Sequence, residues 1–224
     1  MELILAVDLK GGLVVHGKSG NRDEYAPLTW GLSPSAEPAI YIRNMQPEYL
    51  YVADLDRITG VGSHDGIMKR IAPLVSRCYL DRGCRSPSDF LEVPGIENVV
   101  GTETAHEDIR SYTRGFLSLD IKNGKTIPEG NDPVQALKEA DGYGFSGCIV
   151  LNISAVGTEQ GLSEDVLVTM RDAYGKTLLY GGGVRDERDL ARLADAGFDG
   201  AIIATAVHRG TIPLDLIRRG TWSS

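Results

Sequence analysis

Two aspartates follow apolar runs at corresponding positions in the two halves of the chain. Asp8 follows the run 3–7, and Asp120 follows the run 116–119. Two carboxylates in one site can act as a general base and a general acid, provided that their surroundings push their pKa values apart. We therefore predict that Asp8 and Asp120 are catalytic; the alternative is a pair of aspartates that only cap loops.

Three consecutive glycines follow another apolar run, 177–180, and precede a helix that Asp186 opens. Backbone N–H groups in such a turn, together with the positive end of a helix dipole, bind phosphate well. The segment at the end of the last apolar run would form a second wall of the same phosphate site. The predicted phosphate-binding residues are Gly182, Gly183, Ala204 and Thr205. A tight turn made for close packing is the competing interpretation of the glycines.

The corresponding segments of the first half predict a second phosphate site of different character. They contain fewer glycines and two arginines, so that charge would replace backbone N–H groups. The alternative is a simple helix cap. The residues of this second site are Gly83, Arg85, Gly101 and Thr102.

Three further polar side chains are predicted to contact a substrate. Arg22 lies in the polar segment 16–25, which is long for a β–α loop. Such loops often act as lids, and a guanidinium can grip a phosphate or a carboxylate at two points; a solvated loop is the alternative. Asp54 ends the run 49–53, and Asn152 is its partner in the second half.

Short apolar runs alternate with helical patterns along the chain, which is typical of parallel β–α units. The runs span residues 3–7, 49–53, 78–80, 98–100, 116–119, 148–151, 177–180 and 201–204. Helices are predicted at 134–140, 166–174 and 188–196. Eight such units in 224 residues suit a closed (β/α)8 barrel, whose active site lies at the carboxyl ends of its strands; a doubly wound open sheet is the alternative.

The chain also repeats itself. Three blocks of the first half, 5–12, 80–85 and 99–102, reappear in the same order as 117–124, 180–185 and 202–205. The two aspartates differ by 120 − 8 = 112 positions, half of the 224-residue length. We therefore predict a single TIM-barrel domain over 1–224, built from two repeated half-barrels at about 1–112 and 113–224.

Composition narrows the classes of function. The 23 Lys and Arg against 31 Asp and Glu give a net charge of −8, which does not favour binding to nucleic acid or to an anionic membrane. The cysteines form no C-x-x-C pair and the histidines show no metal-ligand spacing, so that neither a disulfide scaffold nor a metal site is predicted. Glu2 and Asp8 flank the first apolar run, which fits neither a signal peptide nor a membrane span. We expect a cytoplasmic protein, with no oligomeric state predicted.

These motifs resemble those of the histidine-biosynthesis barrels, the HisA/HisF family of phosphoribosyl-aminoimidazole enzymes. The likeness runs through nearly the whole chain, in the segments 6–12, 52–56, 101–102, 118–120, 157–158, 182–184 and 204–207. It is closer to the isomerase branch, or to a related paralogue group, than to the cyclase.

The resemblance implies an Amadori rearrangement, in which an aminoaldose 5′-phosphate becomes an aminoketose. One aspartate protonates the ribose ring oxygen, and the other removes the C2 proton of the opened imine. Carried over, Asp8 is the base and Asp120 is the acid. The family substrate is a phosphoribosyl aminoimidazole with a phosphate at each end. No metal or organic cofactor is implied.

Several positions depart from the family pattern. The segment 81–85 stands where relatives have a glycine-rich turn, and Ala204 replaces a glycine beside the phosphate. Leu151 takes the place of a hydroxyl residue, unless a one-residue shift brings Asn152 there, and Val156 takes the place of an aspartate. These changes favour a substrate that differs from the family's.

Two other functions compete with the isomerase. The first is a lyase, epimerase, condensing enzyme or cyclase that acts on a different sugar phosphate, for example in cofactor synthesis; a cyclase would work with a glutaminase partner. The second is a non-catalytic barrel that binds a phosphate ligand. The residues at 151 and 156 favour the binding barrel, whereas Asp8 and Asp120 favour an enzyme.

Overall fold

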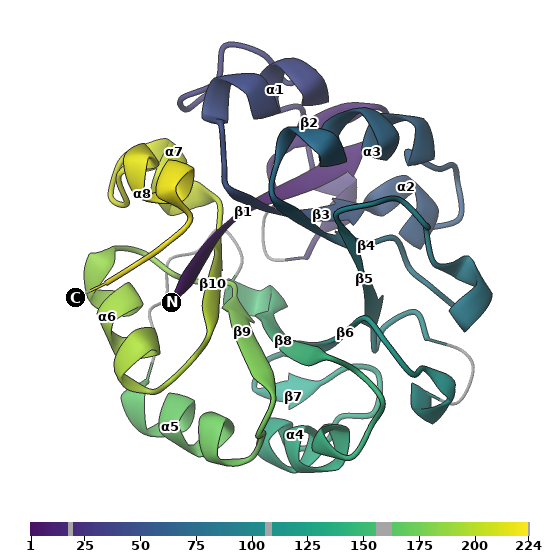
Figure 1. The fold of residues 1–224 in the computed structure, drawn as a ribbon, viewed down its shortest axis with the longest axis vertical. Helices are drawn as coiled ribbons and strands as arrows, with labels where there is room; N and C mark the ends of the chain where they lie inside the picture. The colour runs from purple at the N-terminus through teal and green to yellow at the C-terminus, as the bar shows by residue number, and fades with distance from the viewer. Residues whose placement is uncertain (18–19, 106–108, 156–162, 224) are drawn as a thin grey trace.

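The computed structural model describes residues 1–17, 20–105, 109–155 and 163–223. In these residues, parallel strands form a closed ring, in which each strand pairs with the next and β10 pairs with β1 (Figure 1). The ring strands are β1 (Glu2–Lys10), β3 (Tyr49–Asp54), β4 (Arg77–Asp81), β5 (Ile96–Gly101), β6 (Phe116–Lys122), β8 (Gly147–Asn152), β9 (Thr177–Gly181) and β10 (Gly200–Ile203). Each contains or overlaps one of the predicted apolar runs, and the predicted barrel is confirmed.

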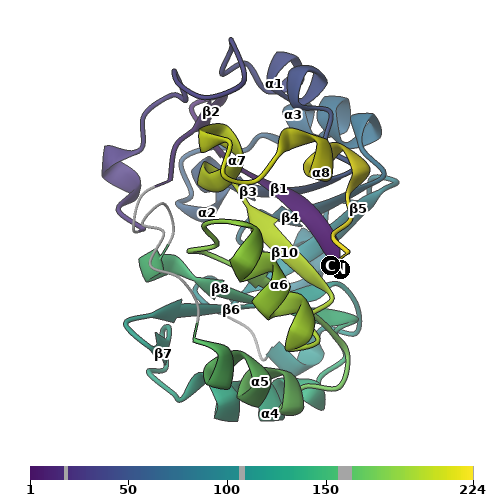
Figure 2. The same ribbon diagram turned by 90° about the vertical axis from the view of Figure 1, so that its left-hand side faces the viewer.

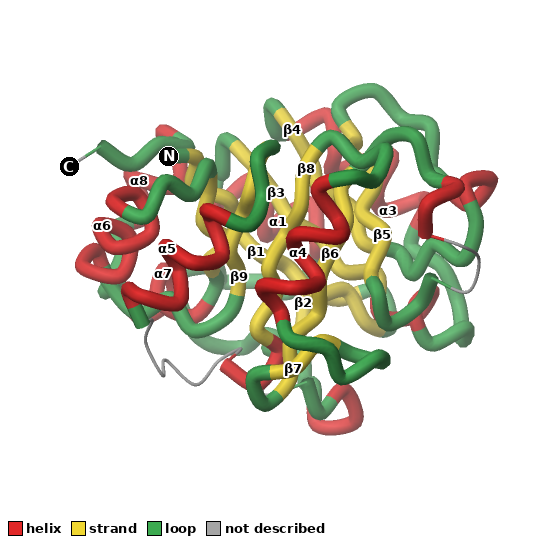
Figure 3. The backbone as a smooth tube through the Cα atoms, turned by 90° about the horizontal axis from the view of Figure 1, so that it is seen from below, coloured by secondary structure: helices red, strands yellow, loops and turns green. Residues whose placement is uncertain are grey.

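The helices lie outside the ring of strands, as Figures 2 and 3 show. They are α1 (Pro38–Met45), α2 (Leu55–Ile58), α3 (Asp65–Ile71), α4 (Pro133–Asp141), α5 (Glu164–Asp172), α6 (Glu187–Asp195), α7 (Thr205–Arg209) and α8 (Leu214–Arg219). Asp132 and Asp186 cap α4 and α6, because each carboxylate accepts two backbone N–H groups of the first turn. The three predicted helices are present within two residues at each end.

The helical layer is thinner beside β4 and β5 than elsewhere. Among the described residues, the connections that follow these strands contain only the 3-10 turns η3 (Pro87–Asp89) and η4 (Ile109–Ser111). The remaining 3-10 turns are η1 (Arg22–Glu24), η2 (Ala72–Leu74) and η5 (Ile153–Ala155). The barrel therefore departs from the regular strand–helix alternation in its first half.

A matching hairpin begins each half of the chain. β1 pairs with the antiparallel strand β2 (Leu13–Val15), and β6 pairs with the antiparallel strand β7 (Lys125–Thr126). Both turns have two residues with positive φ, at 11–12 and at 123–124, as a tight hairpin turn requires. The two turns are 112 positions apart, as the sequence repeat predicts.

The interior of the barrel is a layer of side chains to which every ring strand contributes. They are Ile4, Tyr51, Tyr79, Val99, Phe116, Ile149, Leu179 and Ile202. Because strand side chains alternate between two faces, the next inward position toward the carboxyl end lies two residues later. This alternation aims Asp8 and Asp120 into the barrel, four residues beyond Ile4 and Phe116.

The two termini meet at the amino-terminal end of β1. The backbone N–H of Trp222 donates to Met1 O at 2.9 Å, and the terminal amino group of Met1 donates to Trp222 O at 3.1 Å. The Trp222 ring packs against the hydrophobic core of its own barrel. The tail is therefore part of the fold.

Candidate active site

A cavity of about 210 Å³ opens at the carboxyl ends of the strands. Its wall is made by strand ends and by the loops that follow them, from both halves of the barrel. The described polar residues that line it include Asp8, His16, Arg22, Tyr51, Asp81, Glu103, Asp120, Lys122, Thr205 and His208. The two predicted catalytic aspartates therefore share one cavity.

The surroundings of Asp8 and Asp120 separate their pKa values. Burial raises the pKa of Asp8 to about 6, while the Arg22 guanidinium opposes the rise and the Asp81 carboxylate adds to it. Burial raises the pKa of Asp120 to about 8, again with help from Asp81. The Ser118 hydroxyl donates to Asp120 Oδ1 at 2.8 Å and limits this rise. At neutral pH, Asp8 is mainly ionised and Asp120 mainly protonated, which is the state that a base and an acid require.

Asp81 is a third carboxylate in the same cavity. Its Oδ1 accepts the Gly83 N–H at 3.0 Å, and Tyr51 Oη lies 3.5 Å from its Oδ2. Burial raises the pKa of Asp81 to about 6. Sequence reasoning did not select Asp81 as a site residue, although a signal was present: it ends its apolar run as Asp8 and Asp120 end theirs.

Described residues of the loop after β2 line the cavity, among them Gly17, Gly20 and Arg22. A Cβ atom on Gly17 would lie 2.5 Å from Asp8 Oδ2, and one on Gly20 would lie 2.5 Å from the side chain of Ile153, the first residue of η5. Arg22 donates to both carboxylate oxygens of Glu103, at 2.9 and 2.6 Å. Arg22 therefore lines the cavity as predicted for a substrate contact, and in this structure its charge is paired with Glu103. Residues 18–19 of the loop lie outside the described part of the chain.

The predicted phosphate-binding residues of the second half come together at one end of the cavity. Gly182, Gly183, Ala204 and Thr205 all line it. The glycines are required here: φ is 92° at Gly182, and a Cβ atom there would lie 2.2 Å from Asn152 O. Thr205 Oγ1 lies 3.5 Å from His16 Nε2. This end offers backbone and hydroxyl donors to an anion.

The predicted phosphate-binding residues of the first half do not line the cavity. The Thr102 hydroxyl donates to Ile127 O at 2.7 Å, and the Arg85 side chain is exposed. Gly83 packs on Ile58, where a Cβ atom would lie 2.9 Å from Ile58 Cα. Gly101 lies behind the carboxylates of Asp81 and Asp120. The structure thus differs from the expectation at this end, because Thr102 and Gly83 are committed to the protein's own contacts and the exposed Arg85 side chain is not part of the described cavity lining.

Asp54 and Asn152 also lie outside the cavity lining, for a reason of strand register. On β3 the inward positions are Tyr51 and Ala53, so the next residue, Asp54, faces outward. On β8 the inward positions are Ile149 and Leu151, so Asn152 faces outward, where its side chain hydrogen bonds to Tyr180. Leu151 forms an apolar part of the cavity wall, and Val156 lies outside the described residues.

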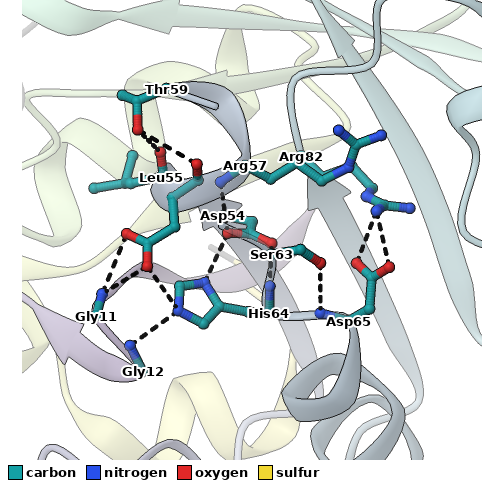
Figure 4. A network of polar contacts seen from close by, with 11 residues as sticks. Gly11, Gly12, Asp54, Leu55, Arg57, Thr59, Ser63, His64, Asp65 and Arg82 are labelled. Atoms are coloured by element: carbon teal, nitrogen blue, oxygen red, sulfur yellow. Dashed lines mark hydrogen bonds and ion pairs between the residues drawn. The ribbon is translucent and has the colours of Figure 1, made fainter. Parts of the chain in front are cut away.

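Asp54 instead belongs to a polar network beneath the β1–β2 turn (Figure 4). His64 Nδ1 lies 2.7 Å from Asp54 Oδ1, and the His64 backbone N–H donates to Asp54 Oδ2 at 2.8 Å. The Gly12 N–H donates to His64 Nε2 at 2.9 Å, and the Gly11 N–H donates to Asp56. The network therefore anchors the β1–β2 hairpin, which contains Asp8, to the end of β3.

Replacing Asp54 with alanine is expected to lower the free energy of unfolding by about 2–4 kcal/mol, because buried donors around it lose their acceptor. The measurement is urea denaturation at pH 7.5. The matched variant Asp56→Ala, at a more exposed carboxylate of the same network, is expected to cost less. Equal stability of Asp54→Ala and the unmodified protein would contradict the structural role.

The cysteines and the potential metal ligands of the described residues form no further site. No group of three or more His, Cys, Asp or Glu side chains there is arranged to hold a metal ion. Cys78, Cys84 and Cys148 are buried thiols, and burial raises the pKa of Cys84 to about 12. None of the described helices combines the length and the apolar character that crossing a membrane requires.

Comparison with known proteins assigns the family. The model of the family described as "Histidine biosynthesis protein" matches residues 2–213. The chain belongs to this family. The family resemblance seen in the sequence is thereby confirmed at the level of the family.

The relatives divide into two groups. An uncharacterized protein of Methanocaldococcus jannaschii is 32% identical, over 97% of both chains. A relative from Thermus thermophilus is 27% identical over 100% of both chains. Another, from Methanosphaera stadtmanae, is 27% identical over 96% of this chain and 97% of its own. Both of these relatives are named as isomerases of an imidazole carboxamide that carries a phosphoribosyl and a phosphoribosylamino group.

Proposed function

We propose that this protein is an aldose–ketose isomerase that converts an aminoaldose phosphate into an aminoketose by an Amadori rearrangement. The observation that carries the proposal is the pair Asp8 and Asp120 in one cavity, with pKa values of about 6 and about 8. Family membership and the isomerase names of two relatives support it.

Asp120 supplies the proton that opens the sugar ring. It donates to the ring oxygen, the bond between this oxygen and C1 breaks, and the amine nitrogen forms an iminium with C1. Asp8 then removes the proton on C2, and the electron pair of that bond forms an enaminol and neutralises the iminium. Tautomerisation places a carbonyl at C2 and a hydrogen on C1. The atoms balance without an oxidant or a reductant, and no cofactor takes part in the proposal.

The substrate phosphate would bind at Gly182, Gly183, Ala204 and Thr205, which line the opposite end of the cavity from Asp81. The two-phosphate aminoimidazole carboxamide is the substrate that the relatives' names support. A different sugar phosphate is the second candidate, and Asp81 favours it, since a carboxylate stands at the end where a second phosphate would be held. A glutaminase partner would be required only for a cyclase reaction.

The test is turnover of aminoaldose phosphates by the purified protein. The two-phosphate aminoimidazole carboxamide aminoaldose is monitored by ultraviolet absorbance with the cyclase as coupling enzyme, and singly phosphorylated aminoaldoses are monitored by NMR of C2. We expect formation of the aminoketose from at least one substrate. Folded protein that converts none of them would refute the isomerase and leave the other sugar-phosphate enzymes and the binding barrel as alternatives.

A further inference from the structure

The charged side chains that line the cavity are unevenly distributed. Asp8, Asp81 and Asp120 lie in its base, and Glu103 lies on its rim. The cations of the described lining are Arg22, which is bonded to Glu103, and Lys122 on the exposed end of β6. The end formed by β9 and β10 instead presents the two glycines and the Thr205 hydroxyl. The two ends of the cavity therefore suit different chemical groups.

At the β4 end, the backbone N–H groups that could bind an anion already donate hydrogen bonds to carboxylates of the protein. Asp81 itself accepts the N–H of Gly83, at 3.0 Å. The next backbone donors in the turn, Arg85 N–H and Ser86 N–H, bind Asp89 Oδ2 at 2.9 and 3.2 Å. The Arg85 contact recurs in the second half, where Arg185 N–H donates to Asp189 Oδ2 at 3.1 Å, so the bond between Asp81 and the Gly83 N–H is what distinguishes this turn.

The arginine of the same turn is also committed. The Arg82 guanidinium forms an ion pair with Asp65 at 2.7 Å and donates to Asp89 O at 3.1 Å. It is 7% exposed and does not belong to the described cavity lining. A second phosphate at this end would face the Asp81 carboxylate, and Arg22, whose positive charge acts on Asp81, is already paired with Glu103, so that repulsion between like charges is only partly offset.

We propose that the ligand carries one phosphate, held at the β9–β10 end, and that its other end presents hydroxyl or amino groups to Asp81. The carboxylate can accept hydrogen bonds from such donors, which a phosphate dianion cannot supply. Asp81 is in this view a specificity-determining residue that rejects two-phosphate substrates. The inference rests on the proposed function for the site, and it concerns binding rather than turnover.

A matched set of ligands tests the proposal. One is the aminoketose form of the two-phosphate aminoimidazole carboxamide; the others are its two singly phosphorylated forms, each ending in a free hydroxyl where a phosphate has been removed. Aminoketoses are already rearranged, so calorimetry at pH 8 measures binding without turnover. The proteins are the unmodified chain, Asp81→Asn, Asp81→Ser and the control Glu92→Gln, which removes a charge on the exposed surface far from the cavity lining.

The unmodified protein is expected to bind the better single-phosphate form at least about tenfold more tightly than the two-phosphate form, the size expected for an unfavourable contact between like charges. Asp81→Asn should bring the two within about threefold, and Glu92→Gln should keep the original ratio. If Asp81→Asn does not fold, Asp81→Ser must show the same change.

Two results would overturn the inference: equal or tighter binding of the two-phosphate ligand by the unmodified protein, or an unchanged ratio in the Asp81 variants. Binding of no ligand would overturn both the inference and the proposed function. Selective binding of a single-phosphate ligand with no turnover of its aminoaldose form would overturn the proposed function alone.

Discussion

Asp8→Asn and Asp120→Asn are each expected to lower kcat/KM by about 10²–10⁴-fold, the usual contribution of a positioned acid or base. Asparagine preserves the shape of the side chain but cannot exchange a proton at neutral pH. The measurement is kcat/KM on whichever aminoaldose phosphate the unmodified protein converts, with circular dichroism to show that each variant is folded.

The pH profile separates the two roles. The unmodified protein should show a bell-shaped dependence of kcat/KM, with an acidic limb near pH 6 where Asp8 ionises and a basic limb near pH 8 where Asp120 loses its proton. Because the carboxylates interact, the limbs belong to the cluster as a whole. Asp8→Asn should remove the acidic limb from its residual activity, and Asp120→Asn the basic one.

Asp81→Asn tests the electrostatic coupling between Asp81 and the two catalytic aspartates. The charge of Asp81 raises the pKa of both Asp8 and Asp120. Its removal should therefore move both limbs to lower pH while the bell shape remains. An Asp8→Asn variant within threefold of the unmodified protein would contradict the assignment of the base.

The fold could be predicted from the sequence because its signal is spread along the whole chain. Every apolar run became a barrel strand, and the repeat offset reappeared as two hairpins with the same register, Lys10 opposite Leu13 and Lys122 opposite Lys125. The thin helical layer beside β4 and β5 was not predicted. There, the capping box at Ser86 and Asp89 closes a short 3-10 turn in place of a helix.

The site could be predicted only in part, because a shift of one residue reverses the direction of a side chain. Asp8 and Asp120 lie on inward positions and were found from their place after an apolar run. Asp54 also ends such a run but faces outward, since its strand places Ala53 inward. Which residues of a strand face inward becomes clear only when one of its aromatic or aliphatic residues, such as Tyr51, is located in the barrel interior.

Asp81 was missed for a different reason. The comparison of the two halves aligned it with a glycine, Gly181, and so presented it as a loss of phosphate-binding character rather than as a gain of a carboxylate. In the barrel, Tyr79 lies in the inner layer and Asp81 follows it two residues later into the cavity. The alternation of inward and outward side chains along β4, rather than similarity between the two halves, identifies the role of Asp81.

Asp120→Asn is expected to stabilise the folded protein as pH rises, by an amount on the order of 6 kcal/mol at pH 9 relative to its effect below pH 4. In the folded state the pKa of Asp120 rises from its ordinary value of 3.8 to about 8. Between these values the unfolded chain releases the proton and the folded chain retains it. The unmodified protein therefore loses stability from about pH 4 to pH 8, and asparagine, which carries no ionisable group, removes this loss.

Urea denaturation at pH 5, 7 and 9 measures the effect. The difference in the free energy of unfolding between Asp120→Asn and the unmodified protein should grow from pH 5 to pH 8 and then stay level. Ser118→Ala is the matched control, since it removes the hydroxyl that donates to Asp120 Oδ1 and keeps the carboxylate. This variant should retain the decline with pH, because the ionisable group is still buried.

Parallel stability curves for Asp120→Asn and the unmodified protein between pH 5 and pH 9 would contradict a raised pKa at this position. The expected result instead links stability to chemistry at one side chain. The burial that makes the ionised form of Asp120 costly to the fold keeps the proton on the carboxyl group at neutral pH. An acid that must protonate a ring oxygen depends on that retained proton, so the variant that folds more stably in alkaline solution should also be one that opens the sugar ring far more slowly.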